Sequence, residues 1–415
     1  MKTPLPPARL HLWTLLLLSV WLATGCNQPL RLVPTLTPAS GAVTPQFVVE
    51  PLVPTALAPT AAPSPLATPH ASTVTAVQTP PPPAPPLAPP LPEPYSLRWR
   101  VGIGVPDGKS PLAYGWPEMR PGWYLNWSAG FTATQWVSDT STLELVIPPD
   151  EAAGMAFVPM VRTPGGELKP PPEVLAQLVT QLPGRTWLIG NEPDVRWQDN
   201  ATPAEYAQAY HLAYTTIKQA DPTASVAIGG VSQITPLRLA YLDQVLDAYQ
   251  SLYGEAMPVD VWNMHAFVLQ ERAGDWGVDI PPGMTEVTEG QLWQIEDHAD
   301  LALVEEQVRA MRRWMAAHGQ REKPLWITEY GILMPASYGF PPDVVGQFLV
   351  DSYDLFDGLR DPDLGYRADD DRLVQRWVWF SAGFDLYPTG NLFHPDGALT
   401  ELMPVLARYL AEQAP

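Results

Sequence analysis

The chain has 415 residues and a formal net charge of −20, and its single cysteine excludes an internal disulfide and a cysteine-based metal site. Residues 1–94 carry a net charge of +1, so the remaining residues carry −21. This acidic balance argues against nucleic acid or an anionic membrane surface as the partner, and it suits a neutral ligand.

Residues 1–25 have the features of an export signal. A basic start is followed by the apolar segment 10–23, which is too short to span a membrane comfortably. Residues 22–26 (LATGC) resemble the bacterial lipobox, although Ala23 stands where leucine is usual. The resemblance implies diacylation at Cys26 and a membrane anchor without a spanning helix. Plain secretion with an incidental thiol is the alternative.

Residues 26–95 form a linker rich in proline, threonine and alanine. Between Asn27 and Pro94, 20 of 68 positions are proline. Such a segment cannot bury a core, and its proline runs stay extended. We predict a disordered, stiff spacer that holds one folded domain, residues 96–415, away from the envelope; a ligand for a proline-binding partner is the alternative.

Eight short apolar runs follow the linker, and helical segments separate most of them. The runs are Arg100–Val105, Trp123–Trp127, Met155–Val161, Thr186–Gly190, Ser225–Gly230, Val259–His265, Pro324–Thr328 and Arg376–Ser381. Continuous apolar runs of this length are typical of parallel strands buried on both faces. We therefore predict eight parallel strands.

Four helices are predicted between these strands, over residues 172–182, 203–220, 237–252 and 300–318. The second has the clearest start, because Thr202 can cap it, Pro203 fits its first position and Glu205 can complete a capping box. Repeated strand–helix units within residues 96–415 predict an α/β fold of the (β/α)8 barrel type. A doubly wound open sheet is the alternative.

Glycines near the first strand bear on that alternative. A doubly wound sheet that binds a nucleotide would carry a glycine-rich loop after its first strand. Gly102 and Gly104 instead lie within the strand, and no third glycine follows in place. We interpret both as close-packing positions in a barrel.

Two carboxylates follow predicted strands. Glu192 lies in the motif Asn-Glu-Pro-Asp after the fourth strand, and Glu329 lies in Thr-Glu-Tyr-Gly after the seventh. Catalytic groups of such barrels lie at the carboxyl ends of the strands. We therefore expect the two carboxylates to face each other across one rim, which is the arrangement that cleaves a glycosidic bond.

These motifs, in this order, resemble glycoside hydrolase clan A, the retaining (β/α)8-barrel glycosidases. The strings at 123–127 (WYLNW) and 157–160 (FVPM) narrow the resemblance to its compact endo-β-1,3-glucanases. The resemblance implies that Glu192 is the general acid/base and Glu329 the nucleophile. In those roles Glu192 needs a raised pKa, and Glu329 must stay ionised.

The same resemblance implies sugar-binding residues around the carboxylates. Asn191 would bind the sugar 2-hydroxyl, His265 would orient the nucleophile side, and Trp379 would stack under the sugar, with Trp377 as its alternative. Asn126, Trp127 and Tyr330 are further candidates for substrate contacts.

One position departs from the clan. The clan often places a tyrosine beside the nucleophile two residues after the histidine, and this chain has Phe267 there. Tyr330 and Tyr387 are the candidates to replace its hydroxyl.

We therefore expect a lipid-anchored, outward-facing, monomeric retaining β-glycosidase that needs no cofactor or metal. Its substrate would be a neutral β-linked glycan, with β-glucan considered before mannan or xylan. The alternatives are a non-catalytic carbohydrate-binding lipoprotein on the same barrel and a solute-binding lipoprotein. Residues 270–297 either wall the cleft or form a surface insertion, and Asp369–Asp371 form either a solvated loop or a calcium site.

Overall fold

The computed structural model describes residues 33–34, 47–48, 90–106, 109–132, 145–146 and 153–413. The predicted export signal, Cys26 and most of the predicted linker lie outside these residues. The chain divides into two compact units, Met1–Ala76 and Val77–Pro415. In the first, β1 (Val33–Pro34) pairs antiparallel with β2 (Phe47–Val48).

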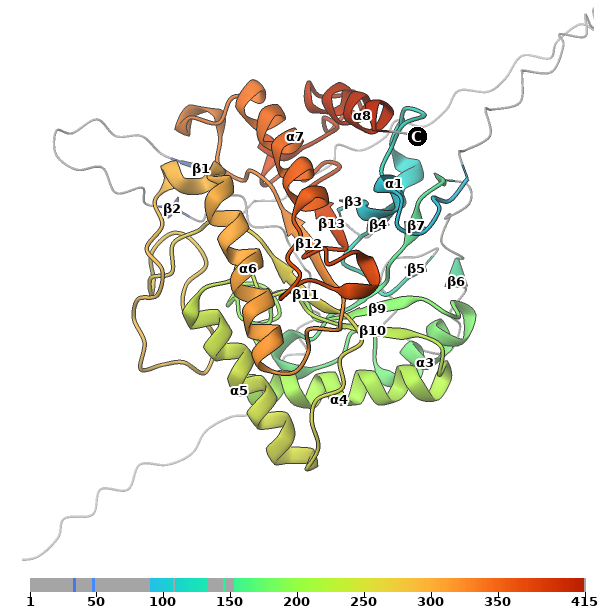
Figure 1. The fold of residues 1–415 in the computed structure, drawn as a ribbon, viewed down its shortest axis with the longest axis vertical. Helices are drawn as coiled ribbons and strands as arrows, with labels where there is room; N and C mark the ends of the chain where they lie inside the picture. The colour runs from blue at the N-terminus through green and yellow to red at the C-terminus, as the bar shows by residue number, and fades with distance from the viewer. Residues whose placement is uncertain are drawn as a thin grey trace, which may run out of the picture. The chain divides into compact units, whose positions relative to one another are not determined.

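The second unit contains a barrel of parallel strands (Figure 1). In chain order the strands are β3 (Val101–Gly104), β4 (Trp123–Leu125), β7 (Ala156–Phe157) with β8 (Met160–Val161), β9 (Thr186–Ile189), β10 (Ser225–Ile228), β11 (Trp262–His265), β12 (Leu325–Tyr330) and β13 (Arg376–Trp379). β7 pairs with β4 and β8 with β9, so together they occupy one strand position.

Pairing around the barrel is continuous. Parallel bridges from Ala227 to Val261, the residue before β11, and from Val231 to Met264 join β10 and its continuation to β11, and β13 pairs with β3. The sheet therefore closes on itself. This confirms the predicted (β/α)8 barrel with its eight strand positions and excludes the doubly wound open sheet.

Helices cover the outside of the barrel (Figure 1). They are α1 (Leu97–Arg100), α3 (Pro172–Gln181), α4 (Pro203–Ala220), α5 (Pro236–Tyr253), α6 (Leu301–Ala317), α7 (Pro342–Gly358) and α8 (Leu402–Glu412). The four predicted helices are confirmed, and Thr202 forms the expected capping box with Glu205. None of the helices in the described residues is both long enough and apolar enough to cross a bilayer.

Shorter elements fill the connections. β5 (Phe131–Thr132) pairs antiparallel with β6 (Leu145–Val146) between the second and third strand positions. The short 3-10 helices among the described residues are η1 (Pro111–Ala113), η2 (Pro164–Gly166), η3 (Ile295–Ala299), η4 (Ala336–Tyr338), η5 (Arg367–Asp369) and η6 (Pro388–Gly390).

Apolar side chains pack both inside the barrel and between its strands and helices. The inner cluster consists of Trp123, Leu125, Val158, Met160, Leu188, Ala227, Val261, Trp326 and Val378. Along β13, Val378 faces inward, whereas Trp377 and Trp379 belong to the outer core. A Cβ on Gly102 would lie 2.4 Å from the Trp123 ring, which confirms that this glycine permits close packing in the barrel wall.

The chain enters the barrel at the amino-terminal ends of the strands. Arg98, just before β3, donates from Nη1 to the carbonyl oxygen of Pro90 at 2.7 Å. Next to it, Arg100 binds both carboxylate oxygens of Asp369, at 2.6 and 2.7 Å. Because Arg100 neutralises this buried carboxylate, Asp369 is not available to the calcium ion considered from the sequence.

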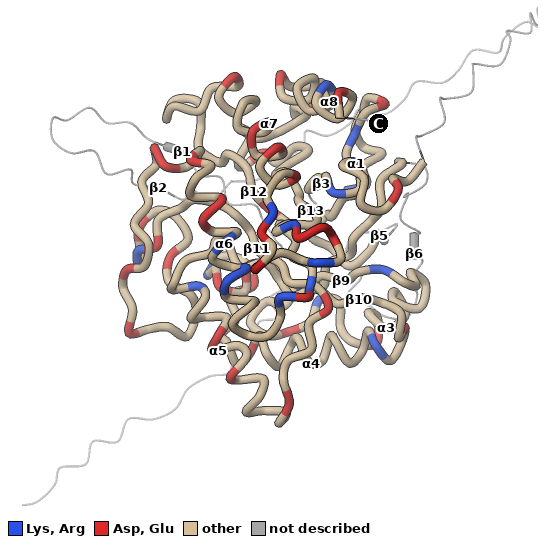
Figure 2. Tube along the Cα trace, in the orientation of Figure 1, with Lys and Arg blue, Asp and Glu red and all other residues tan. Residues whose placement is uncertain are grey.

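Charged side chains lie mainly on the outer elements. Acidic residues are spread over helices and connecting loops, and acidic and basic residues are mixed near the ends of α6 and α7 (Figure 2). Pairs such as Arg360–Asp370, at 3.4 Å, are exposed and stabilise the fold little. The surface charge fits the neutral ligand expected from the sequence better than a polyanion.

Candidate active site

Glu192 follows a sharp turn at the carboxyl end of β9. Gly190 has a φ of 89° and Glu192 a φ of 43°, so both adopt the left-handed conformation. A Cβ on Gly190 would lie 2.9 Å from Thr163 Oγ1, which explains the glycine. The Glu192 amide donates to the Gly230 carbonyl oxygen at 3.0 Å, and this bond ties the turn to the end of β10.

A carboxylate behind this turn holds its shape. Asp199 Oδ2 accepts hydrogen bonds from the backbone amides of Asn191 and Thr163, at 2.8 and 2.7 Å. Arg162 pairs with the other oxygen of Asp199 at 2.7 Å. The Asn191–Glu192 segment is therefore fixed before any ligand arrives.

A second anchor lies deeper in the fold, where Arg238 of α5 is fully buried. Its guanidinium contacts Asp194 at 2.8 Å and Glu271 at 2.6 Å. Asp194 is the last residue of the Asn-Glu-Pro-Asp motif, and Glu271 belongs to the segment between β11 and α6. Arg238 therefore joins the Glu192 turn to that segment, a link that sequence spacing did not indicate.

Glu329 reaches the barrel interior because β12 contains a bulge. Ile327 pairs with Trp377 and Tyr330 with Trp379, so β12 has one residue more than β13 between the paired positions. The register with β11 shifts at the same place. Thr328 donates to Asn263 inside the barrel at 3.0 Å, and Glu329 also points inward. The bulge thus re-aims the carboxylate.

His265, at the end of β11, lies between the two carboxylates. Its Nδ1 is 2.9 Å from Glu192 Oε1, and its Nε2 is 3.7 Å from Glu329 Oε1. The atoms that the three residues offer all lie within 4.8 Å of one another. The structure therefore brings together Glu192, Glu329 and His265, as the strand order predicted.

Burial and mutual charge set the electrostatics of this group. The pKa of Glu329 is raised to about 7, chiefly by burial. The charge of His265 lowers this pKa, the charge of Glu192 raises it, and the hydrogen bond from Trp127 lowers it. Burial lowers the pKa of His265, but Glu329 and Glu192 outweigh that effect and the net direction is upward. The sequence-based expectation placed a raised pKa on Glu192; here the buried Glu329 carries one. Protons on such a pair belong to the pair rather than to one residue.

The same three side chains form a possible ligand set for a divalent cation, since each offers one ligand atom. The expectation that no metal is required therefore stays a prediction.

Two asparagines that were predicted to contact substrate present buried amide oxygens. Asn191 donates from Nδ2 to Gln198 at 3.3 Å, and Asn126 donates to the Lys109 carbonyl oxygen at 3.4 Å. Among the described residues, no group donates to Oδ1 of either asparagine. A buried acceptor without a partner is costly, so each oxygen keeps an unused capacity to accept a hydrogen bond.

Tyr330 and Trp379 are not in the site, which corrects two predictions. Tyr330 is buried with its hydroxyl 3.2 Å from Ser352 of α7, because the bulge turns it outward as Glu329 turns inward. Trp379 is also buried in the outer core and donates to the Gly390 carbonyl oxygen at 2.7 Å. Trp377 faces the same way, so neither tryptophan of β13 can stack under a sugar.

A separate buried apolar cluster packs against Trp127 at the carboxyl ends of the strands. This rim cluster consists of Val195, Phe267, Leu269, Val278 and Phe380. The Phe380 ring lies edge-on to Trp127, with centroids 5.7 Å apart. Phe380 directly follows Trp379, so correct alternation along β13 was the signal that could have identified it.

Tyr387, the other candidate for a hydroxyl near the carboxylates, packs against the rim cluster. Burial, and then the charge of Glu192, raise the pKa of its phenol. Tyr387 is therefore electrostatically linked to Glu192 rather than to Glu329.

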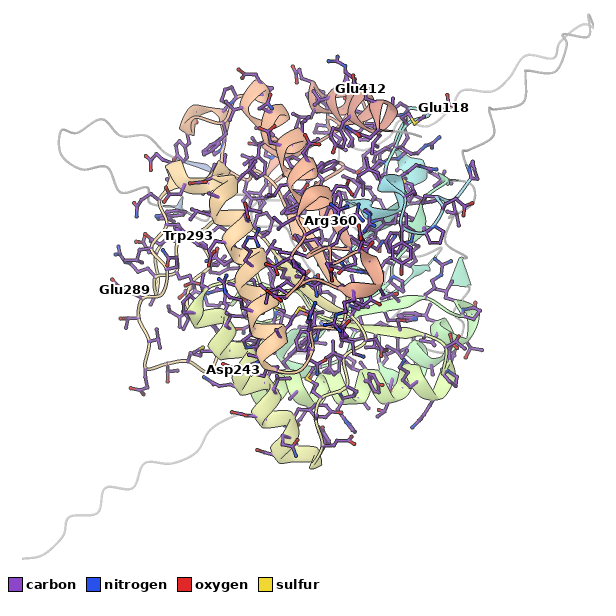
Figure 3. The ribbon with its side chains drawn as sticks, viewed as in Figure 1. Glu118, Asp243, Glu289, Trp293, Arg360 and Glu412 are labelled. Atoms are coloured by element: carbon purple, nitrogen blue, oxygen red, sulfur yellow. The ribbon has the colours of Figure 1, made fainter. Side chains whose placement is uncertain are left out.

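The segment between β11 and α6 contributes to the rim only in part. Val278 belongs to the rim cluster and Trp276 packs against it, whereas Trp293 packs against the outer core. Glu289 and Trp293 are both seen at the same outer edge of the unit (Figure 3). The first half of the segment is thus near the site, and the second half is a surface feature.

No family model matches the chain, and no curated protein matches it. Among solved structures, it is similar to a GH128 (subgroup II) endo-β-1,3-glucanase from Sorangium cellulosum, with 18% identity over 74% of this chain and 97% of that chain and a TM-score of 0.47. It is also similar to a subgroup II endo-β-1,3-glucanase from Pseudomonas viridiflava, with 19% identity over 74% of this chain and 96% of that chain and a TM-score of 0.49. A third similar structure is a curdlan-specific exo-β-1,3-glucanase (GH128, subgroup III) from Blastomyces gilchristii, with 18% identity over 75% of this chain and 98% of that chain and a TM-score of 0.45.

Proposed function

We propose that this protein is a retaining β-glycosidase that hydrolyses a neutral β-glucan by double displacement. One observation carries the proposal: oxygens of Glu192 and Glu329 lie within 4.8 Å of each other at the mouth of a closed barrel, with His265 between them. Retaining enzymes need carboxyl groups about 5–5.5 Å apart, whereas inverting enzymes need about 6.5–9.5 Å to admit a water. The short separation favours retention.

In the first step, a Glu329 oxygen attacks the anomeric carbon. The bond from that carbon to the glycosidic oxygen breaks, and the oxygen takes its electron pair and the proton of Glu192. In the second step, Glu192 accepts a proton from water as the water oxygen attacks the anomeric carbon. The bond to Glu329 breaks and the carboxylate is restored.

Residues around the pair fit these steps. The raised pKa of Glu329 allows the pair to hold one proton in mildly acidic solution, and substrate can direct that proton to Glu192. The amide oxygens of Asn126 and Asn191 are acceptors that no described group uses.

Digestion of a glycan panel tests the proposal. The protein is incubated with β-1,3-glucan, β-1,4-glucan, mannan and xylan, with and without EDTA, and fresh products are followed by proton NMR. We expect cleavage of β-1,3-glucan first, a β-anomer as the initial product, and equal rates with EDTA. An α-anomer would contradict double displacement. Binding without cleavage of any glycan would favour the carbohydrate-binding alternative. Loss of hydrolysis in the presence of EDTA would show that Glu192, His265 and Glu329 hold a metal ion.

Gly230→Ala should disconnect His265 from the carboxylates. A Cβ at this position would lie 2.4 Å from Cδ2 and 2.7 Å from Nε2 of the imidazole, so the ring must move. Because misplacement by about 1 Å can lower a rate by about 10²-fold, kcat/KM should fall by about that factor. Gly358→Ala, where a Cβ meets no atom within 4 Å, is the matched control. Equal activity of the two variants would exclude a bridging role for His265.

We further propose that the protein is a lipid-anchored monomer whose site faces away from the membrane. The described part of the second unit begins at Pro90, beside the amino-terminal end of β3, whereas the carboxylates lie at the carboxyl ends of β9 and β12. Cys26→Ser should release the protein from the membrane fraction, and an unchanged distribution would favour plain secretion.

A further inference from the structure

Glu329 is contacted through one of its two oxygens. Trp127 donates from its indole nitrogen to Oε1 at 2.6 Å, and His265 Nε2 approaches the same oxygen at 3.7 Å. Within the described part of the chain, Oε2 accepts no hydrogen bond. The two oxygens of this carboxylate are therefore not equivalent.

The surroundings of Trp127 hold its indole in this position. Trp127 has a φ of 54°, a conformation that non-glycine residues rarely adopt. Its ring lies against Gly104, where a Cβ would come within 2.6 Å of Cη2. The Phe380 ring packs edge-on against it. A backbone turn, a glycine and an aromatic neighbour thus all act to place one N–H group.

An indole differs from the other groups near Glu329. It donates a hydrogen bond but carries no charge, and it does not titrate in the working range of an enzyme. The charge of His265 depends on its protonation, its Nε2 makes no hydrogen bond to Glu329, and Phe267 has no donor. Trp127 is therefore a permanent donor to the carboxylate, whatever the state of the imidazole.

We propose that Trp127 is a positioning residue that tethers Oε1 of Glu329 and thereby assigns nucleophilic attack to Oε2. This inference rests on the proposed function. A lone pair of Oε2 forms the bond to the anomeric carbon while the glycosidic bond breaks and the leaving oxygen takes the Glu192 proton. The indole N–H stays on Oε1 throughout, so it favours the ionised carboxylate before attack and fixes the plane of the ester afterwards.

Replacing Trp127 by phenylalanine tests the tether, because it keeps an aromatic ring and removes the N–H. We expect kcat to fall by about 10- to 100-fold with a smaller change in KM, since a hydrogen bond to a charged group is lost. The pKa of Glu329 should rise, and the acid limb of the pH–rate profile should move to higher pH by about one unit. Trp293→Phe, on the outer side of the segment before α6, is the matched control and should keep the wild-type profile.

A second measurement does not depend on catalysis. The Glu329 carboxyl is titrated by difference infrared spectroscopy, in which the spectrum of the Glu329→Gln variant is subtracted to isolate its signal. The titration is done in the wild type and in a protein carrying benzothienylalanine at position 127. That side chain keeps the bicyclic shape and lacks only the N–H. A raised Glu329 pKa supports the tether even if no glycan is cleaved, which separates this inference from the proposed function.

Two results would overturn the inference. An unchanged Glu329 pKa in both variants, with only KM raised, would make Trp127 a simple sugar contact. A raised pKa with kcat unchanged would show a hydrogen bond that does not position the attacking oxygen.

Discussion

Glu329→Gln is expected to lower turnover by about 10⁴-fold or more while sugar binding persists, the scale seen when a catalytic nucleophile is removed. The glutamine amide at position 329 cannot form the covalent intermediate. It keeps the shape of the glutamate side chain and an oxygen that can accept the hydrogen bond from Trp127. Isothermal titration with the preferred oligosaccharide, together with initial rates, measures both effects. Loss of binding together with turnover would instead indicate a disturbed cleft.

The same substitution should make the protein more stable in neutral and alkaline solution. The folded-state pKa of Glu329, about 7, is above its ordinary value of 4.5. Between these values the folded state binds more protons than the unfolded state, so ionising Glu329 lowers stability as pH rises through this window. Above pH 7 the penalty reaches about 3 kcal/mol at most. Removing it should stabilise the variant at pH 8 and leave stability near pH 4.5 almost unchanged.

Denaturant unfolding at both pH values measures this difference. Glu296→Gln, an exposed residue of η3, is the control and should change stability equally little at either pH. A Glu329→Gln protein with the wild-type dependence of stability on pH would show that Glu329 ionises normally in the folded state.

Glu192→Gln should impair the two steps of the reaction unequally. A glucan leaving group needs a proton, so its cleavage should fall by about 10²- to 10⁴-fold. An aryl glycoside with an acidic phenol leaves without one, so glycosylation of Glu329 should stay fast and hydrolysis of the ester should become slow. Mass spectrometry should then detect the glycosyl-enzyme, and azide should accept the sugar in place of water with retained configuration.

The pH profile of this variant gives a second readout. Removing the Glu192 charge removes one cause that raises the Glu329 pKa. The acid limb for aryl glycosides should therefore move to lower pH than in the wild type, opposite in direction to Trp127→Phe. Equal losses on glucan and on aryl glycosides would mean that Glu192 does not act as the acid.

Local features of the sequence were enough to predict the fold. Each strand was a continuous apolar run, and the capping box at Thr202 and Glu205 marked the start of α4. Strand order then placed Glu192 and Glu329 at one rim. These features depend on a residue and its near neighbours, or on the connectivity of the barrel, so they can be recognised before the chain is folded.

Only the tertiary structure decided which side chains face the site. An extra residue in β12, visible only in its pairing with β11 and β13, sends Glu329 inward and Tyr330 outward. Side chains along β13 alternate between inward and outward directions, so Trp379 packs in the outer core and Phe380 belongs to the rim cluster. The contact from Trp127 to Glu329 joins residues 202 positions apart. Side-chain direction in a sheet depends on register with other strands, and burial shifts a pKa only once those strands have closed around the group.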